Sequence, residues 1–159
     1  DLPLSREGME QLGTLHYVLP PVRFLTSGMQ RTEQTLAVLF GDVPHGQDAA
    51  FREIDFGAFE MHSYAQLKEN PDYIAWISGD NHRNVPPGGE SGEAMTARVL
   101  AGFRRLQMEN LPTALITHGG VIAAIMESLF PEEKKSRYQW QPEPGHGYVI
   151  FEGGYQAIP

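Results

Sequence analysis

The residues best suited to chemistry are His118, Gly119 and Gly120, which follow the apolar and β-branched run 114–117. That run predicts a buried strand of a mainly parallel sheet, and the apolar spacing of 121–129 predicts a mostly buried helix. An imidazole would then lie at the carboxyl end of a strand, where open α/β sheets bind ligands. Backbone N–H groups and the positive dipole end of the helix favour an anion there. The segment therefore predicts a site for a phosphate-like group, with His118 as a further donor or cation.

The same segment also fits a purely structural role. A neighbouring carbonyl could satisfy His118 at the end of the strand, and the two glycines could merely permit a tight turn. Both interpretations are equally compatible with this stretch taken alone.

Arg31 is the second candidate, one turn into a helix expected over 29–40. A guanidinium group binds a phosphate through two parallel hydrogen bonds, a geometry that lysine does not offer. A solvated helix arginine is the commoner case for such a residue on its own.

Glu53 is the third candidate, between an expected strand and the turn at 56–57, with apolar and aromatic neighbours. A carboxyl group in such surroundings could serve as a general acid. The structural alternative is a strand-end glutamate paired with Arg52 or another cation, and Asp55 and Glu60 rank below Glu53.

Two other patterns carry less weight. The run Pro87-Gly88-Gly89-Glu90-Ser91 is similar to a phosphate-binding glycine loop, but loop closure and helix capping explain it as well. The histidines at 16, 45, 62, 82 and 146 have no metal-ligand spacing with one another or with carboxylates, so we predict no metal site.

Composition narrows the class of protein. A chain of 159 residues, 41% hydrophobic and 20% charged, suits one globular domain. A formal charge of −8 argues against nucleic acid as a partner, although one or two local cations could still hold a small phosphorylated ligand. The lack of cysteine excludes disulfides and thiol catalysis and is compatible with the cytoplasmic location that we expect. No apolar run is long enough for a membrane span, and a homodimer is compatible with the sequence.

The elements that must position the candidates alternate along the chain, which predicts a single α/β domain over 1–159. We expect a three-layer sandwich, with one mixed, mostly parallel sheet flanked by helices. Helices are predicted from Ser5 to about Leu19 and at 29–40, 64–70, 71–77, 91–108 and 121–129, with Ser27 capping the second. Strands are predicted at 22–26, 49–54 and 114–117, with a hairpin of 147–151 and 155–158. Turns, loops and polar connections are predicted at 41–47, 78–89 and 131–138.

Five motifs in order resemble the histidine phosphatase (phosphoglycerate-mutase-like) superfamily. They are Asp1-Leu2-Pro3-Leu4-Ser5-x-x-Gly8, Ser27-x-x-x-Arg31-x-x-Gln34-Thr35, Glu53-x-Asp55-Phe56-Gly57-x-Phe59-Glu60, Pro87-Gly88-Gly89-Glu90-Ser91 and Thr117-His118-Gly119-Gly120. Together they cover nearly the whole chain. Within the superfamily, Phe59-Glu60-Met61 and the aromatic residues that follow look most like the α-ribazole phosphatases of cobalamin nucleotide-loop assembly, and the compact length fits that branch.

The resemblance implies a phosphatase that works without metal or cofactor. A nucleophilic histidine takes the phosphoryl group in line, and water releases it from the phosphohistidine. Arg31 would hold the phosphoryl oxygens, and His118, with Gly119 beside it, would stabilise their charge in the transition state. Glu53 would protonate the leaving alkoxide and then deprotonate the attacking water.

The sequence departs from the family at its start. The family begins with a strand that ends in Arg-His-Gly and supplies the nucleophile, and no Arg-His-Gly occurs here. Either a segment that carries it precedes Asp1 in the working protein, or this is a relative without a nucleophile. We expect the former, because in the family that strand lies inside the sheet, beside the strand that precedes His118. Without it, each unpaired backbone group would cost about 1 to 3 kcal/mol.

Overall fold

The central sheet has three parallel strands in the computed structural model, in which the structure is described for residues 1–80 and 82–158. β1 (Arg23–Thr26) lies between β2 (His45–Gln47) and β3 (Thr113–Ile116). The register pairs Thr26 with Gln47 on one side and with Ile116 on the other. All three strands therefore end at the same edge of the sheet, and the residues that follow them meet there.

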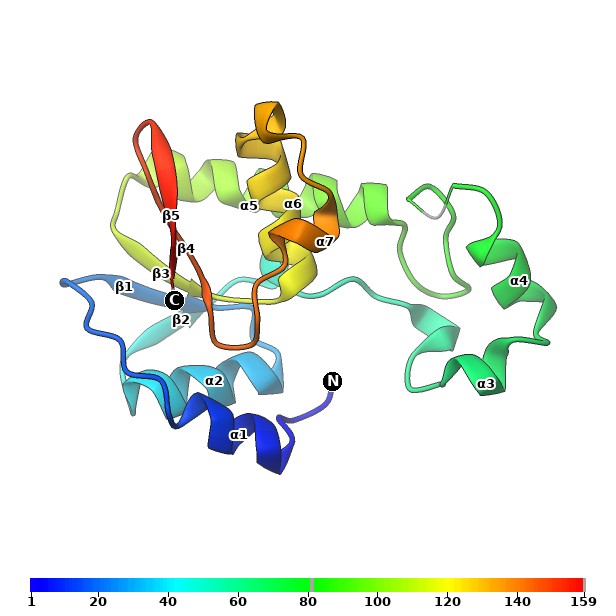
Figure 1. Cartoon of the computed structure of the whole chain (residues 1–159), viewed down its shortest axis with the longest axis horizontal. Helices are drawn as coiled ribbons and strands as arrows, with labels where there is room; N and C mark the ends of the chain where they lie inside the picture. The colour runs from blue at the N-terminus through cyan, green and yellow to red at the C-terminus, as the bar shows by residue number, and fades with distance from the viewer. Residues whose placement is uncertain (81, 159) are drawn as a thin grey trace.

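Helices cover both faces of this sheet (Figure 1). α1 (Arg6–Leu12) and α2 (Gln30–Phe40) lie on one side, and α5 (Gly92–Glu109) and α6 (Gly119–Leu129) lie on the other. The predicted fold class, a parallel sheet flanked by helices in three layers, is confirmed. None of the described helices is both long and apolar enough to cross a membrane.

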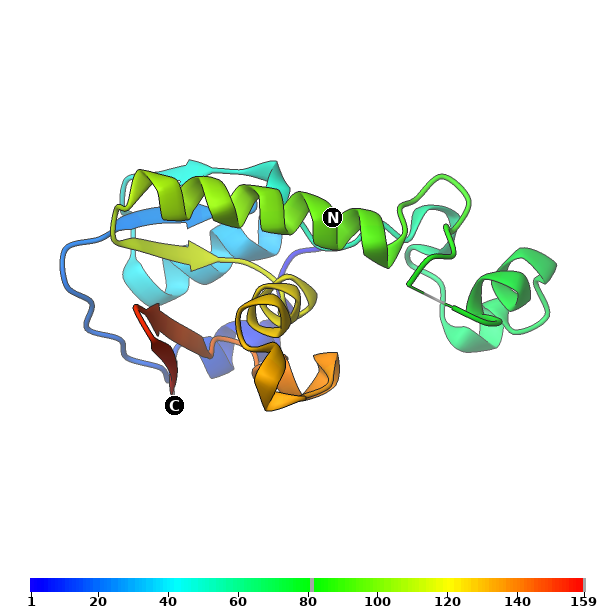
Figure 2. The ribbon, with the colours of Figure 1, turned by 90° about the horizontal axis from the view of Figure 1, so that it is seen from above.

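The hairpin differs from the prediction of one mixed sheet. β4 (Gly147–Phe151) and β5 (Gly154–Ile158) pair only with each other among the described residues, and they form a separate antiparallel sheet. Figure 2 shows this hairpin, in red, on the far side of β3 from β1. Hydrogen-bonded strands lie about 4.8 Å apart, and no described strand occupies that position beside the outer edge of β3.

The prediction of a strand at 49–54 is wrong. The residues there begin with a 3₁₀ turn, η1 (Ala49–Phe51), that Asp48 caps by accepting a hydrogen bond from the backbone N–H of Ala50 at 2.9 Å. The strand lies earlier, within the predicted turn 41–47, at β2. β2 is polar and exposed, so it has no apolar alternation, whereas the apolar residues of η1 pack against α5.

Most other differences between the predicted and the observed elements lie at the ends of helices. Ser5 caps α1 as predicted, but the helix ends at Leu12 instead of about Leu19, because Gly13 lowers helix propensity and serves as the C-cap. The polar connection predicted at 131–138 contains a 3₁₀ turn, η3 (Pro131–Glu133), and the start of α7 (Arg137–Trp140). α7 forms because Trp140 is buried beside α6.

Residues 56–77 form a lobe that extends away from the sheet in Figure 1. It contains η2 (Gly57–Phe59), α3 (Tyr64–Leu67) and α4 (Pro71–Ile77), close to the two predicted helices. Aromatic rings hold it together, with Phe59 and Trp76 at 5.5 Å between ring centroids. The predicted loop 78–89 has no helix or strand at its described positions, and Asn81 lies outside the described residues.

Phe51 is fully buried in the core between α5 and α6 and anchors the chain just before Glu53. Truncating it to alanine leaves a cavity, so we expect Phe51→Ala to lower the free energy of unfolding by about 3 to 5 kcal/mol. Phe151→Ala is the matched control, because its side chain is 55% exposed, and we expect a loss below about 1 kcal/mol. Denaturant titration of both variants measures the difference, and equal losses would contradict this description of the core.

Candidate active site

His118 lies where the sheet edge meets the first turn of α6. It follows β3 by two residues and occupies the N-cap position of α6 with an extended backbone. Its side chain is buried, and Nε2 lies 2.9 Å from Oγ of Ser27, the residue directly after β1. The parallel pairing of β1 with β3 therefore brings these two side chains together.

The start of α6 offers backbone donors to an anion. Among the described residues no side chain caps this helix, so N–H groups of its first turn, that of Gly119 among them, have no side-chain acceptor. The helix dipole adds positive potential at the same place. This arrangement is the anion-favouring helix start that the sequence predicts.

The surroundings of His118 keep its imidazole neutral. Burial, as the largest cause, and the positive charges of Arg31, Arg52 and Arg98 together lower the pKa of His118 to about 3. Burial removes water from the imidazolium form, and each nearby guanidinium repels it. Three cations around one neutral imidazole make this edge of the sheet a place that favours a negative ligand.

Arg31 lies in the first turn of α2, the helix that follows β1. Its side chain is 30% exposed, and its Nη1 lies 3.8 Å from the Asp1 carboxylate. That carboxylate also accepts a hydrogen bond from the backbone N–H of Gln30, at 3.0 Å, at the start of α2. Asp1 thus holds Arg31 at the sheet edge through a long ion pair, which leaves the guanidinium free to bind a second anion.

Glu53 reaches the first turn of α6. Its Oε1 would lie 2.8 Å from a Cβ built on Gly120, so the carboxylate rests where only a glycine leaves room. Oε1 also accepts a hydrogen bond from the N–H of Ile54 at 3.0 Å. The structure therefore brings all three predicted side chains, those of Arg31, Glu53 and His118, to one edge of the sheet.

Arg98 of α5 holds the segment that carries Glu53. Its guanidinium donates to the carbonyl oxygens of Ala50, Arg52 and Glu53 at 2.8 to 3.1 Å. It also pairs with Glu90, with Nε to Oε2 at 3.1 Å. Since its donors are engaged by these groups, Arg98 contributes charge and support to the site.

In the glycine run at 88–89, Gly89 serves packing, whereas Gly88 has a positive φ of 72° and open space around it. A Cβ on Gly89 would lie 2.4 Å from the carbonyl oxygen of Asp55, and one on Gly57 would lie 2.2 Å from that of Pro87. The two backbones approach so closely that side chains are excluded. Ser91 caps α5 by accepting from the N–H of Ala94 at 3.0 Å, as the capping interpretation predicts.

Sequence reasoning missed three residues that shape the site. Ser27 is predicted as the cap of α2, but Met29 is the N-cap, and the Ser27 hydroxyl faces His118. Its position directly after a strand was the available signal. Arg52 and Arg98 act on His118 through charge, and nothing in their local sequence marks them for that role.

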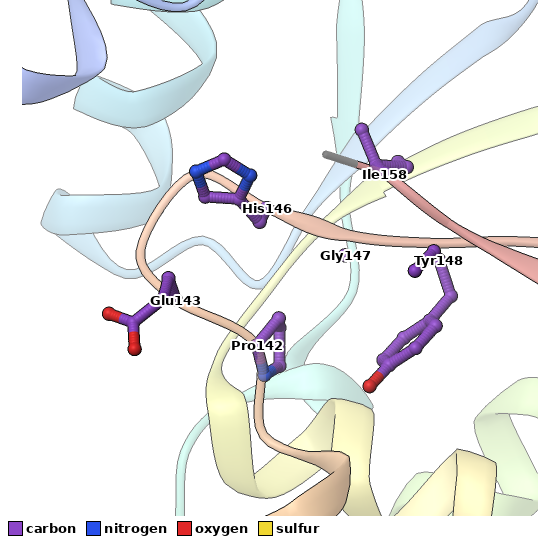
Figure 3. Close-up of a pocket in the computed structure, with 7 residues that line it drawn as sticks. Pro142, Glu143, His146, Gly147, Tyr148 and Ile158 are labelled. Atoms are coloured by element: carbon purple, nitrogen blue, oxygen red, sulfur yellow. The ribbon is translucent and has the colours of Figure 1, made fainter.

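A separate hollow of about 280 Å³ lies between the segment 142–148 and the end of β5 (Figure 3). Its lining includes Glu143, His146 and Tyr148, and none of the predicted site residues. The side chains with the chemistry described above therefore lie outside this hollow.

The profile of the histidine phosphatase superfamily (branch 1) matches residues 1–154, and this chain belongs to that superfamily. Two α-ribazole phosphatases share the fold. The putative α-ribazole-5′-P phosphatase from Escherichia coli has a TM-score of 0.81 and 22% identity, and the α-ribazole phosphatase from Shigella flexneri has 0.82 and 24%. Each alignment covers 98% of this chain and 82% of the other.

A phosphoglycerate mutase from Thermus thermophilus is also similar, with a TM-score of 0.70 and 29% identity. That alignment covers 100% of this chain and 84% of the mutase. No curated protein matches the sequence. The structural neighbours of this chain therefore include proteins named as phosphatases and one named as a mutase.

The low pKa of His118 has a consequence for stability. Above about pH 6.5 the imidazole is neutral in both the folded and the unfolded chain. As the pH falls below 6.5, the unfolded chain binds a proton that the folded chain does not, so the free energy of unfolding decreases. We expect protonation of His118 in the unfolded chain to lower the free energy of unfolding by about 2 kcal/mol between pH 6.5 and 5. Denaturant titrations in phosphate-free buffer measure it, with His118→Gln as the variant that lacks this contribution.

His45 provides a control, because its effect on stability changes with pH in the opposite direction. Hydrogen bonds to the Val43 carbonyl and to the Glu33 carboxylate, the latter at 2.7 Å, raise the pKa of His45. The contribution of His45 to the free energy of unfolding is therefore present at acidic pH and is lost as the pH rises through the raised pKa. His45→Gln should lower stability most at low pH. A His118→Gln profile parallel to that of the parent protein would contradict the neutral, buried imidazole.

Proposed function

We propose that this protein is a phosphomonoesterase that works through a phosphohistidine intermediate and needs no metal. The observation that carries the proposal is the convergence of Arg31, Glu53 and neutral His118 on uncapped N–H groups of α6. A helix start with a guanidinium beside it suits the three terminal oxygens of a phosphoryl group. Membership of the histidine phosphatase superfamily supports the same reaction class.

The proposed reaction has two steps. A histidine nitrogen forms a bond to phosphorus while the P–O ester bond breaks, and Glu53 gives its proton to the leaving alkoxide. Water then attacks the phosphohistidine, Glu53 takes a proton from that water, and inorganic phosphate and free histidine result. Arg31 and His118 hold the phosphoryl oxygens, whose charge they stabilise in both transition states.

The nucleophile in this proposal is a second histidine close to His118. The outer edge of β3, which no described strand covers, is the position beside His118 where a further parallel strand would present it. Rapid quenching with substrate in an alkaline denaturant, in which phosphohistidine is stable, followed by mapping of the phosphohistidine by mass spectrometry, locates the residue. We expect the phosphoryl group on a histidine other than His118. Phosphate binding without turnover would instead favour a non-catalytic phosphoryl-ligand binder.

The leading substrate is α-ribazole 5′-phosphate, as in cobalamin biosynthesis. The fold shared with two α-ribazole phosphatases supports this choice, and the similarity to a phosphoglycerate mutase favours mutase or broad sugar-phosphate phosphatase activity as the alternative. Parallel assays of α-ribazole 5′-phosphate hydrolysis, 3-phosphoglycerate isomerisation and sugar-phosphate hydrolysis decide between them. We expect the highest kcat/KM for α-ribazole 5′-phosphate. The proposed location is the cytoplasm.

Arg31→Ala tests whether this edge of the sheet is the phosphoryl site. Losing the guanidinium removes two charge-assisted hydrogen bonds to the transferring group, so we expect kcat/KM to fall by roughly a hundredfold or more. Arg6→Ala is the control, since Arg6 lies on the exposed face of α1 and its ion pair with Glu10 is local to that helix. Unchanged turnover in Arg31→Ala would contradict the proposal.

Gly120→Ala tests the position of Glu53. The added Cβ would displace the carboxylate that lies 2.8 Å away, so we expect a roughly tenfold to hundredfold loss of kcat in a folded protein. Glu53→Gln should lose about a hundredfold or more, because its amide cannot supply the proton. Gly147→Ala is the matched control, since a Cβ there has no neighbour within 4 Å. Full activity in Gly120→Ala would show that Glu53 does not act from this place.

A further inference from the structure

A chain of hydroxyl groups leads from His118 into the first turn of α2. Ser27 Oγ lies 2.9 Å from His118 Nε2 and 3.0 Å from Thr32 Oγ1. The Thr32 hydroxyl donates to the carbonyl oxygen of Met29 at 2.7 Å, and the N–H of Met29 donates to Ser27 Oγ at 3.2 Å. Ser27, Thr32 and His118 are all buried, so their polar atoms depend on one another for hydrogen bonds.

The number of protons available in this network of hydroxyl groups fixes the direction of each of its hydrogen bonds. A hydroxyl group carries one proton, and the Thr32 proton points to the Met29 carbonyl. In the contact between Thr32 and Ser27, the donor is therefore Ser27. Its only proton is then used, so in the contact with His118 the donor is the imidazole Nε2–H. Ser27 Oγ accepts two hydrogen bonds and donates one, which completes its capacity.

The other ring nitrogen of His118 is open to a ligand. Nδ1 makes no hydrogen bond within the described residues, and no fully buried side-chain nitrogen or oxygen among them lacks a partner. Nδ1 therefore reaches the accessible side of the site. In a neutral imidazole with its proton on Nε2, this atom carries a lone pair.

We propose that Ser27 and Thr32 are positioning residues, which hold His118 as the Nε2–H tautomer so that Nδ1 is the nitrogen that contacts the phosphoryl group. The tautomer follows from the hydrogen bonds alone, whereas the identity of the ligand rests on the proposed function. Since Nδ1 offers a lone pair, its contact with a phosphoryl oxygen contains one proton. A monoanionic phosphate supplies that proton from its P–OH, whereas a dianion binds together with one proton taken up from the solvent. In both cases the bound imidazole shares the positive charge that stabilises the phosphoryl oxygens.

Nitrogen NMR of protein labelled with ¹⁵N-histidine tests the tautomer directly, with His118→Gln identifying the signal. We expect a pyrrole-type Nε2 and a pyridine-type Nδ1 near neutral pH. In Thr32→Val, the Ser27 proton becomes free to donate to Nε2, so the population should move toward the Nδ1–H form. Thr32→Ser keeps the hydroxyl and should restore the parent spectrum. The other histidine signals report whether each variant is folded.

Thr35→Val is the matched control, because the Thr35 hydroxyl also donates to a carbonyl of α2, that of Arg31 at 2.8 Å, and no hydrogen bond among the described residues joins it to Ser27. We expect it to leave the His118 signal and turnover unchanged, while Thr32→Val lowers kcat roughly tenfold or more. An Nδ1–H tautomer in the parent protein, or an unchanged signal in Thr32→Val, would overturn the inference.

The kinetic outcomes separate this inference from the proposed function. If His118→Gln abolishes turnover and Thr32→Val does not lower it, the positioning role is wrong and the phosphatase proposal stands. If His118→Gln keeps full turnover, the phosphatase proposal fails, and the NMR result still decides the tautomer.

Discussion

The parallel pairing of β1 with β3 is the constraint on which the rest of the structure depends. It places Thr26 opposite Ile116, so the chain leaves both strands at the same edge of the sheet. Ser27 follows one strand and His118 follows the other, and their side chains meet in a buried hydrogen bond. The helices that return from this edge, α2 and α6, then direct their first turns toward the same point. A change in register by one residue would separate these groups.

Glu53 depends on a different kind of support, because no regular strand or helix carries it. The segment that holds it is fixed by Arg98 through three carbonyl oxygens and by the close approach of the backbones at Gly57 and Gly89. Its carboxylate then packs against the first turn of α6 at Gly120. Irregular backbone can hold a functional group in a fixed position when each of its polar groups has a partner.

Local charge at the site opposes the charge of the whole chain. The net charge is −8, yet three arginines lie close enough to His118 to lower its pKa. A neutral imidazole is the form that tolerates such surroundings, and a negative ligand would relieve the repulsion among the cations.

The sequence by itself determined the alternation of elements, the strand and helix around His118, and the three candidates Arg31, Glu53 and His118, because these depend on local apolar period and on ordered motifs. The tertiary structure alone decided where the third strand lies, since exposed β2 has no apolar alternation, and that the hairpin forms its own sheet. It also revealed Ser27 as the partner of His118, because this contact joins residues that are 91 positions apart and depends on strand register. Local propensity carries no information about such long-range pairing, which the packing of the whole sheet determines.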